Sequence, residues 1–241
     1  MDMGRLGPSD LEISRLGIGT APIGSRPGEW WVNWGPQDDG DSVRAVHAAV
    51  DGGVNWVDTA PFYGWGHAEE VVGRALAGRE NVLVFTKCGT LRRDDGDDFM
   101  DLSPESVRQG CEESLRRLGR EQIDLLQFHD PDRNVPIEES WGALQKLVAE
   151  GKVRHGGLSN HSAELVERAL AVGPVAALQF QYSALARATR RTCFPTRSTG
   201  ASASSSGRRS RAGFSRTASR STPSPRTTSG ARTPSPTWTS A

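Results

Sequence analysis

Short apolar runs alternate along the chain with segments in which apolar residues recur every three or four positions. Runs of the first kind are typical of strands buried on both faces of a parallel sheet. They cover residues 16–19, 54–57, 81–87, 123–129, 153–160 and 176–181. Helical spacing covers residues 42–51, 69–76, 103–118, 136–150 and 163–172, with Ser42 and Ser103 as predicted N-caps. Repeated strand–helix units, about six of them behind an N-terminal lid or hairpin, predict an α/β protein that closes as an α/β barrel.

The predicted strands end in polar residues that are capable of chemistry. Strand 54–57 runs into Asp58, and Tyr63 lies in the loop that follows. Taken alone, Asp58 is explained equally well as a helix cap, and Tyr63 as a packing tyrosine. The later strands end in the same way, in Lys87, His129, Ser159 with Asn160, and Gln179 or Gln181. Because the carboxyl ends of barrel strands meet at one rim, these side chains are predicted to form one site.

An Asp, Tyr, Lys and His set suits the reduction of a carbonyl group by hydride. Hydride arriving at the carbonyl carbon leaves charge on the oxygen, so a proton donor must stand beside that oxygen. A free tyrosine, with a pKa of about 10, is a weak donor. A nearby ammonium lowers the pKa of the phenol, and a carboxylate keeps the ammonium charged and in place. A neutral histidine can donate a hydrogen bond to the same oxygen.

At these residues the chain resembles the aldo-keto reductases. The resemblance covers roughly residues 4–187 and is carried by four stretches: DTAPFYGWGHAEEVVGRAL, the strand ending FTK, the strand ending LLQFHDPD, and GKVRHGGLSNHS. It implies a (β/α)8 barrel that binds NADPH, or less often NADH, across the rim. It also implies an enzyme that reduces aldehydes or ketones to alcohols.

The resemblance assigns a role to each rim residue. The implied catalytic set is Tyr63 as general acid, Asp58 and Lys87, which tune it, and His129, which orients the carbonyl. The implied cofactor contacts are Gly19, Thr20, Asp58, Ser159, Asn160 and Gln179.

Tryptophans near the rim predict the walls of a substrate pocket. Trp30 and Trp31 lie in a polar loop, and Trp65 follows Tyr63. Partial burial beneath the domain explains such indoles equally well. The WGPQDD segment and this loop resemble the bacterial branches of the family that act on sugars, polyols or small aldehydes.

After residue 187 a different kind of sequence begins. Residues 1–167 hold all 29 acidic residues, whereas residues 168–241 hold 12 arginines and no acid. Of the 52 residues from position 190 onward, 38 are Ser, Thr, Arg or Pro, a composition that is predicted to be disordered. We therefore divide the chain into an incomplete aldo-keto reductase barrel at 1–187 and a low-complexity tail at 188–241.

Two interpretations of the tail compete. It is either an appended basic segment that binds nucleic acid through phosphates, or the product of a frameshift. With GC-rich codons for residues 193–214, regrouping one base earlier yields LPYALDGGIGVLVWSPLASGF, which resembles the seventh strand of the family and its flanks. The frameshift is favoured, because few Ser- and Arg-rich peptides could be regrouped into a family strand at the correct place. Against nucleic-acid binding, the tail offers few aromatics for base stacking. It predicts two missing strands, open sheet edges and impaired activity.

A further alternative is a non-catalytic, cofactor-sensing or regulatory subunit of the same fold, which the intact rim residues argue against. The predicted partner is a small carbonyl substrate, with no nucleic acid and no membrane, since no apolar run approaches about 20 residues. No metal site is predicted. The 3 widely spaced cysteines suit free thiols in a reducing cytoplasm. No feature of the sequence predicts an oligomeric state.

Overall fold

A parallel sheet of six strands is the centre of the fold. The computed structural model describes residues 1–24, 35–93 and 96–181. Trp30, Trp31 and the predicted tail at 188–241 lie outside these residues. The strands follow the spatial order β10-β9-β8-β5-β4-β3. They are β3 (Ile18–Gly19), β4 (Trp56–Asp58), β5 (Leu83–Cys88), β8 (Ile123–Phe128), β9 (Val153–Ser159) and β10 (Ala177–Gln179).

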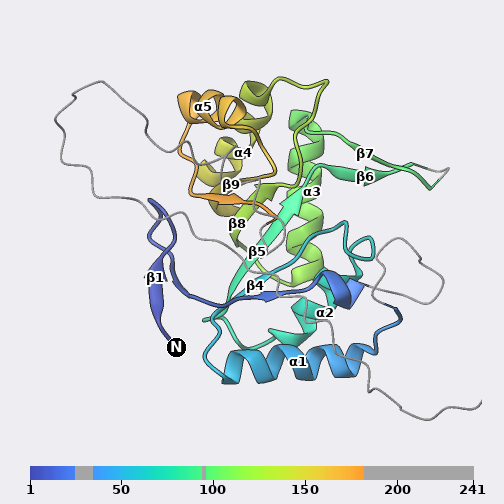
Figure 1. Ribbon diagram of the computed structural model, residues 1–241. Helices are drawn as coiled ribbons and strands as arrows, with labels where there is room; N and C mark the ends of the chain where they lie inside the picture. The colour runs from blue at the N-terminus through green and yellow to red at the C-terminus, as the bar shows by residue number, and fades with distance from the viewer. Residues whose placement is uncertain (25–34, 94–95, 182–241) are drawn as a thin grey trace, which may run out of the picture.

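All neighbouring strands of this sheet are parallel. Strands of the sheet that follow one another along the chain also lie next to one another in space. The predicted order of strand–helix units is therefore confirmed, and the fold is an incomplete (β/α)8 barrel (Figure 1). The connecting helices are α1 (Asp39–Asp51), α2 (His67–Ala75), α3 (Pro104–Leu118), α4 (Ile137–Ala149) and α5 (Ala163–Val172).

Of the two predicted N-caps, one is confirmed and one is wrong. Ser103 caps α3 as predicted: its hydroxyl accepts the backbone N–H of Ser106, and Pro104 takes the first helical position. The prediction of Ser42 as the N-cap of α1 is wrong. Asp38 is the cap, with its carboxylate accepting the Asp41 N–H at 2.8 Å, because an acid one turn earlier offers a stronger acceptor.

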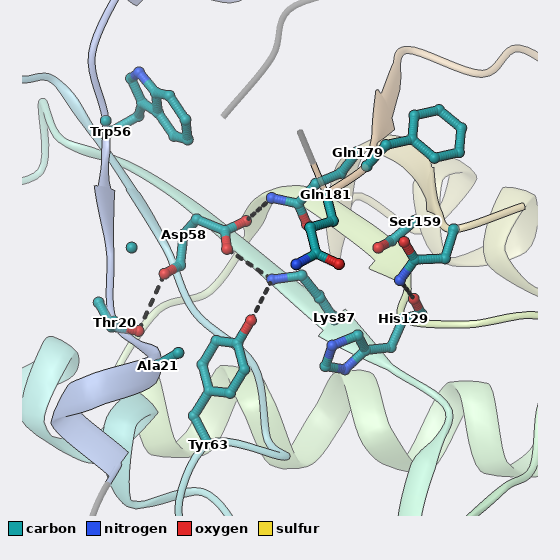
Figure 2. Close-up of a pocket in the computed structure, with 14 residues that line it drawn as sticks. Thr20, Ala21, Trp56, Asp58, Tyr63, Lys87, His129, Ser159, Gln179 and Gln181 are labelled. Atoms are coloured by element: carbon teal, nitrogen blue, oxygen red, sulfur yellow. Dashed lines mark hydrogen bonds and ion pairs between the residues drawn. The ribbon is translucent and has the colours of Figure 1, made fainter. Parts of the chain in front are cut away.

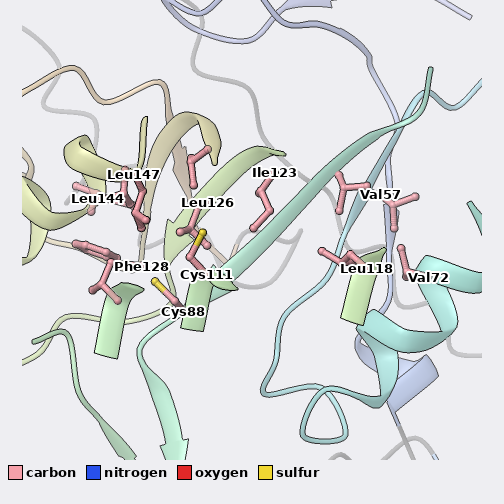
Figure 3. Packing of buried hydrophobic residues seen from close by; sticks show 14 of the residues in the cluster. Val57, Val72, Cys88, Cys111, Leu118, Ile123, Leu126, Phe128, Leu144 and Leu147 are labelled. Carbon is pink, nitrogen blue, oxygen red and sulfur yellow. The ribbon is translucent and has the colours of Figure 1, made fainter. Parts of the chain in front are cut away.

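The core consists of two apolar layers on the two faces of the sheet. The larger layer lies between the strands and the helices, and includes Val57, Val72, Leu118, Leu126 and Leu144 (Figure 3). The smaller layer lies on the inner face and includes Leu6, Leu11, Trp56, Phe85 and Leu125. Alternate residues of one strand thus enter different layers. Each fully buried large side chain contributes roughly 1.5–3 kcal/mol.

An N-terminal hairpin covers the inner apolar layer at the amino ends of the strands. It pairs β1 (Met3–Arg5) with β2 (Glu12–Ser14), and its connecting turn carries the buried Leu6 and Leu11. In the same turn, Asp10 accepts hydrogen bonds from Arg154 at 2.7 Å and His155 at 2.6 Å, both at the start of β9. The predicted lid or hairpin is therefore a floor that closes the barrel interior at the amino ends of the strands.

Two short elements were not predicted. A second hairpin, of β6 (Thr90–Arg92) and β7 (Asp98–Met100), follows β5, and a single 3-10 turn, η1 (Ala21–Gly24), follows β3. Both hairpin strands are only three residues long, too short to produce a recognisable hydrophobic pattern. None of the helices described in the structure is long and apolar enough to cross a membrane.

Candidate active site

One pocket at the carboxyl ends of the strands collects every predicted catalytic and cofactor-contacting residue. The residues are Gly19, Thr20, Asp58, Tyr63, Lys87, His129, Ser159, Asn160 and Gln179. The parallel register explains the grouping, because the last residues of neighbouring strands stand side by side: Gly19 pairs with Asp58, and Gln179 with Ser159. Figure 2 shows Asp58, Tyr63, Lys87 and Gln179 pointing toward one another in the pocket.

Asp58, Lys87 and Tyr63 form a continuous row of polar contacts (Figure 2). The Lys87 ammonium donates to Asp58 Oδ1 at 2.7 Å and to the Tyr63 hydroxyl at 3.3 Å. It also donates to the backbone carbonyl of Thr59 at 3.0 Å. Lys87 is only 2% exposed and Asp58 6%, so water does not compete for these bonds. The ammonium therefore has a carboxylate on one side and a phenol on the other.

The protonation states follow from burial and from these neighbours. Burial by itself lowers the pKa of Lys87, but the charge of Asp58 and the contact with Tyr63 outweigh it, so the pKa of Lys87 is raised. Burial raises the pKa of Tyr63; Lys87 lowers it and Asp58 raises it again. The net result is a raised pKa. Lys87 acts on the pKa of the phenol in the expected direction. The expectation that the pKa of Tyr63 is lowered overall is wrong, because burial outweighs Lys87.

His129 is the uncharged member of the set. Burial, and then the positive charge of Lys87, lower the pKa of His129 to about 3. Its ring meets the rings of Tyr63 and Phe62 edge to face, with centroids 5.9 and 5.7 Å apart. The imidazole is therefore neutral at physiological pH and lies against the phenol.

The second oxygen of Asp58 is held by two amides. Gln179 donates to Oδ2 at 3.0 Å, and Gln127 of β8 donates to the same oxygen at 3.4 Å. Gln127 was not singled out from the sequence. The available signal was a polar side chain two residues before His129, which places it on the same, inner face of the strand.

Ser159 and Asn160 form the turn after β9. Asn160 adopts a left-handed backbone conformation (φ +59°) and donates its backbone N–H to the Gln179 carbonyl at 3.0 Å. Its side-chain nitrogen donates to Asp130 at 2.9 Å, and burial raises the pKa of that carboxyl. The buried His161 contacts the Ser159 carbonyl through Nδ1 at 2.6 Å. Asp130 and His161, both missed from the sequence, thus hold this turn in place.

The donor set of the pocket fits a nicotinamide carboxamide. Such a group needs hydrogen-bond donors for its oxygen and acceptors for its nitrogen, and a hydroxyl (Ser159) and two side-chain amides (Asn160, Gln179) line one side of the pocket. On the other side, Thr20 donates its backbone N–H to the Asp58 carbonyl at 3.0 Å, which fixes the turn after β3. The residues present therefore match the group that the resemblance implies.

The predicted tryptophan wall lies mainly outside the described residues, since Trp30 and Trp31 are not among them. Trp65 is absent from the residues that line the pocket and packs edge to face on Phe62, with centroids 5.4 Å apart. The guanidinium of Arg92, from the unpredicted hairpin, lies 5.4 Å from the Trp65 ring centroid. Within residues 1–24, 35–93 and 96–181, no group of three or more His, Cys, Asp or Glu side chains could hold a metal ion.

Comparison with known proteins agrees with the fold. The family profile described as "Aldo/keto reductase family" matches residues 15–199. The chain therefore belongs to the aldo/keto reductase family, whose members are oxidoreductases that use NAD(P)H. It is 36% identical over 204 residues to the NADH-specific methylglyoxal reductase of Escherichia coli (strain K12), covering 79% of this chain and 61% of that one. It is 38% identical over 181 residues to the probable aldo-keto reductase 1 of Glycine max, covering 74% and 51%.

Solved structures give the same result. The glycerol dehydrogenase AKR11B4 from Gluconobacter oxydans superposes with a TM-score of 0.72 at 42% identity, over 79% of this chain and 58% of that one. An aldo/keto reductase from Klebsiella pneumoniae, in complex with NADP and acetate, superposes with a TM-score of 0.63 at 30% identity, over 78% of this chain and 61% of that one. The chain spans between one half and about three fifths of the length of the curated relatives it matches.

Proposed function

We propose that the pocket reduces small aldehydes and ketones to alcohols with a nicotinamide cofactor, and that Tyr63 is the proton donor. The observation that carries this proposal is the row Asp58–Lys87–Tyr63, with contacts of 2.7 and 3.3 Å, in one pocket with a neutral His129. A reduced nicotinamide ring, when bound, supplies the hydride. The residues of this chain supply orientation and the proton.

Each side chain has a separate task in this proposal. His129 donates a hydrogen bond to the carbonyl oxygen, which a neutral imidazole can do without competing for the proton. Tyr63 stays protonated at physiological pH because its pKa is raised, and it transfers its proton as negative charge develops on the oxygen. Lys87 stabilises the phenolate that remains, and Asp58 keeps Lys87 charged.

The substrate class proposed here is a sugar, a polyol-derived carbonyl or another small carbonyl. Two relatives support this range, since one is named for methylglyoxal and the other for glycerol. NADPH is the cofactor that we propose first, with NADH as the alternative. The names of the relatives point both ways, because one is called NADH-specific and one structure holds NADP.

Replacing Tyr63 with Phe tests the proposal directly. The change removes the hydroxyl and little else, so we expect turnover of methylglyoxal to fall by about 10²–10⁴-fold, while NADPH binding is kept. Turnover is followed by NADPH absorbance and binding by tryptophan fluorescence. A Tyr63→Phe protein that reduces the substrate at the wild-type rate removes Tyr63 from its role. In a chain whose reading frame has been restored, cofactor binding without any reduction supports the non-catalytic, cofactor-sensing alternative.

We also propose that the segment from about residue 188 is a frameshift product and that this chain is impaired. Within the described residues the sheet ends at β3 and β10, which form the two edges of an open barrel. Unpaired edges favour association between chains and expose the site to water. Sequencing the gene around codons 185–195 tests the proposal: a reading frame shifted by one base should continue with residues typical of strands and helices. An early stop in that frame would contradict it. The cytoplasmic location expected from the cysteines stays a prediction.

A further inference from the structure

Gln127 is a buried polar residue beside the proposed site but not in its pocket. It lies on the inner face of β8, and 2% of its surface is exposed. It lines a smaller hollow inside the barrel with Asp58 and Leu125, and is not among the residues around Tyr63 and His129 that line the main pocket. A buried amide in an apolar interior costs free energy unless it is hydrogen-bonded. The contact with Asp58 Oδ2, 3.4 Å long, accounts for its position.

The neighbouring strand leaves room for this side chain. Gln127 pairs with Gly157 across β8 and β9. A Cβ atom at Gly157 would lie 3.0 Å from Gln127 Cγ and 3.2 Å from the carbonyl of Ala177. The missing side chain at position 157 therefore provides the space through which Gln127 reaches toward Asp58.

The two oxygens of Asp58 have different partners as a result. Oδ1 accepts from the Lys87 ammonium, and Oδ2 accepts from Gln179 and Gln127. An ionised carboxylate only accepts hydrogen bonds, so the amide nitrogen of Gln127 must face it. Donors on Oδ2 keep the carboxylate from turning away from Lys87.

We propose that Gln127 is a positioning residue of this site: through Asp58 Oδ2 it fixes the carboxylate that holds Lys87 against the Tyr63 hydroxyl. The proposal rests on the proposed function for its meaning in catalysis. The structural coupling of Gln127 to Tyr63 is measurable without cofactor or substrate.

Tyr63 itself can report on this coupling. The chain has 2 tyrosines, so the full chain carrying Tyr182→Phe and labelled with ¹³Cζ-tyrosine gives one signal, from Tyr63. In this protein we compare Gln127→Glu with Gln109→Glu. Gln109 is a matched control, since it is exposed on α3 and also donates to a carboxylate, that of Glu113 at 3.0 Å.

In Gln127→Glu, the introduced carboxyl group replaces the amide as donor to Asp58 while it is protonated. Its pKa should be raised by burial and by the adjacent carboxylate. Ionisation then places a second negative charge beside Asp58, so we expect a new step in the pH titration of the Tyr63 signal between about pH 5 and 8. The unfolding temperature should fall over the same range, because a carboxyl group whose pKa is raised on folding stabilises at low pH and loses that effect as pH rises. Gln109→Glu should show neither change.

Gln127→Met gives a second, independent answer if the Gln127→Glu chain does not fold at neutral pH. It keeps the volume and removes the donor, so the Tyr63 signal should move, whereas Gln109→Met should leave it unchanged. With Asp58→Asn in the same chain, the displacement caused by Gln127→Met should disappear. A wild-type Tyr63 signal in a folded Gln127→Met or Gln127→Glu chain, or a displacement that persists with Asp58→Asn, overturns the proposal. A catalytically normal Tyr63→Phe enzyme would instead overturn the proposed function and leave the Gln127–Asp58 coupling intact.

Discussion

Two buried ion pairs lie on opposite faces of the same sheet. On the inner face, Asp58 pairs with Lys87 at 2.7 Å, and both side chains are less than one tenth exposed. On the outer face, Glu69 of α2 pairs with Arg117 of α3 at 2.6 Å, with side-chain exposures of 0 and 10%. Burying two opposite charges is costly in either place, and the attraction between them only roughly compensates for it.

The two pairs differ in what surrounds them. The second oxygen of Glu69 accepts the hydroxyl of Thr86 at 2.6 Å, and Arg117 donates also to Glu113, so the outer pair joins two helices to β5. The inner pair lies in a pocket wall, and the ammonium has a phenol as a further neighbour. A buried ion pair is therefore no sign of catalysis by itself. The inner pair differs from the outer pair because it borders a pocket in which a ligand can reach it.

The largest effect is expected for Lys87→Met. The change leaves Asp58 buried without its cation and removes the group that lowers the pKa of Tyr63. We expect a loss of about 3–5 kcal/mol in the free energy of unfolding. Carbonyl reduction should fall by about 10²-fold or more. Urea unfolding and NADPH oxidation measure the two losses, and a variant as active as the wild type would place Lys87 outside the reaction.

Arg117→Met is the counterpart on the outer face. It leaves Glu69 buried without its cation, so the loss of stability should be similar, about 3–5 kcal/mol. The rate per folded molecule should stay within about twofold, because no atom of this pair borders the pocket. Arg116→Met removes the same charge from an exposed neighbour on α3 and should change neither quantity. A loss of turnover without unfolding would show that the outer pair also acts on the site.

Alanine substitutions at two adjacent glycines compare the two faces of the sheet, with smaller expected losses of stability. A Cβ at Gly156 would lie 2.5 Å from Leu144 and 2.8 Å from Trp141, in the outer layer. Gly156→Ala should therefore lose about 1–3 kcal/mol through overpacking against α4. At Gly157 the nearest atom is Gln127 Cγ, 3.0 Å away, and that side chain can shift. Gly157→Ala should cost less stability but displace the Tyr63 signal. Thermal unfolding with the tyrosine label compares the two, and equal effects on both measurements would contradict the division into faces.

The last prediction concerns pH. His129 has a folded pKa of about 3, below the value of about 6.5 for an unfolded histidine, so the unfolded chain binds the extra proton between these limits. Stability should therefore fall as pH drops from about 6.5 toward 3, by at most about 1.4 kcal/mol per pH unit for this group. His161, whose pKa burial also lowers, acts in the same direction. His129→Gln should make the decline shallower without abolishing it. The free energy of unfolding is measured with urea between about pH 4.5 and 7.5. If its dependence on pH is the same in His129→Gln as in the unchanged chain, His129 is protonated in the folded chain.

Much of the fold was predictable because it depends on apolar runs. The strands at 81–87, 123–129 and 153–160 are continuous enough to be recognised without any partner, and β5, β8 and β9 lie within one or two residues of those limits. Strand boundaries near the site were less accurate. The run at 54–57 became β4 at Trp56–Asp58, because its pairing with β3 and β5 fixes which residues are in the sheet.

Site residues that end a strand could be predicted from the sequence, whereas residues that hold them from inside a strand could not. Asp58, Lys87 and His129 stand at strand ends, and the parallel topology brings them together. Gln127 lies inside a strand, and its role depends on the empty space at Gly157, which only the packing reveals. In the sequence Glu69 looks like an ordinary acid of a first helical turn; its burial depends on Arg117, 48 positions away.

The floor hairpin has a consequence for the order in which the chain can fold. Its turn is tied to β9 by Asp10, whose partners Arg154 and His155 are 144 and 145 positions further along the sequence. Gly7 in the same turn approaches the carbonyl of Ala176 so closely that a Cβ would lie 2.4 Å from it. During synthesis, therefore, the turn of this hairpin lacks these two partners until β9 and the start of β10 follow. Contacts of such long range make folding slow, and until they form Leu6 and Leu11 remain exposed to water and to other nascent chains.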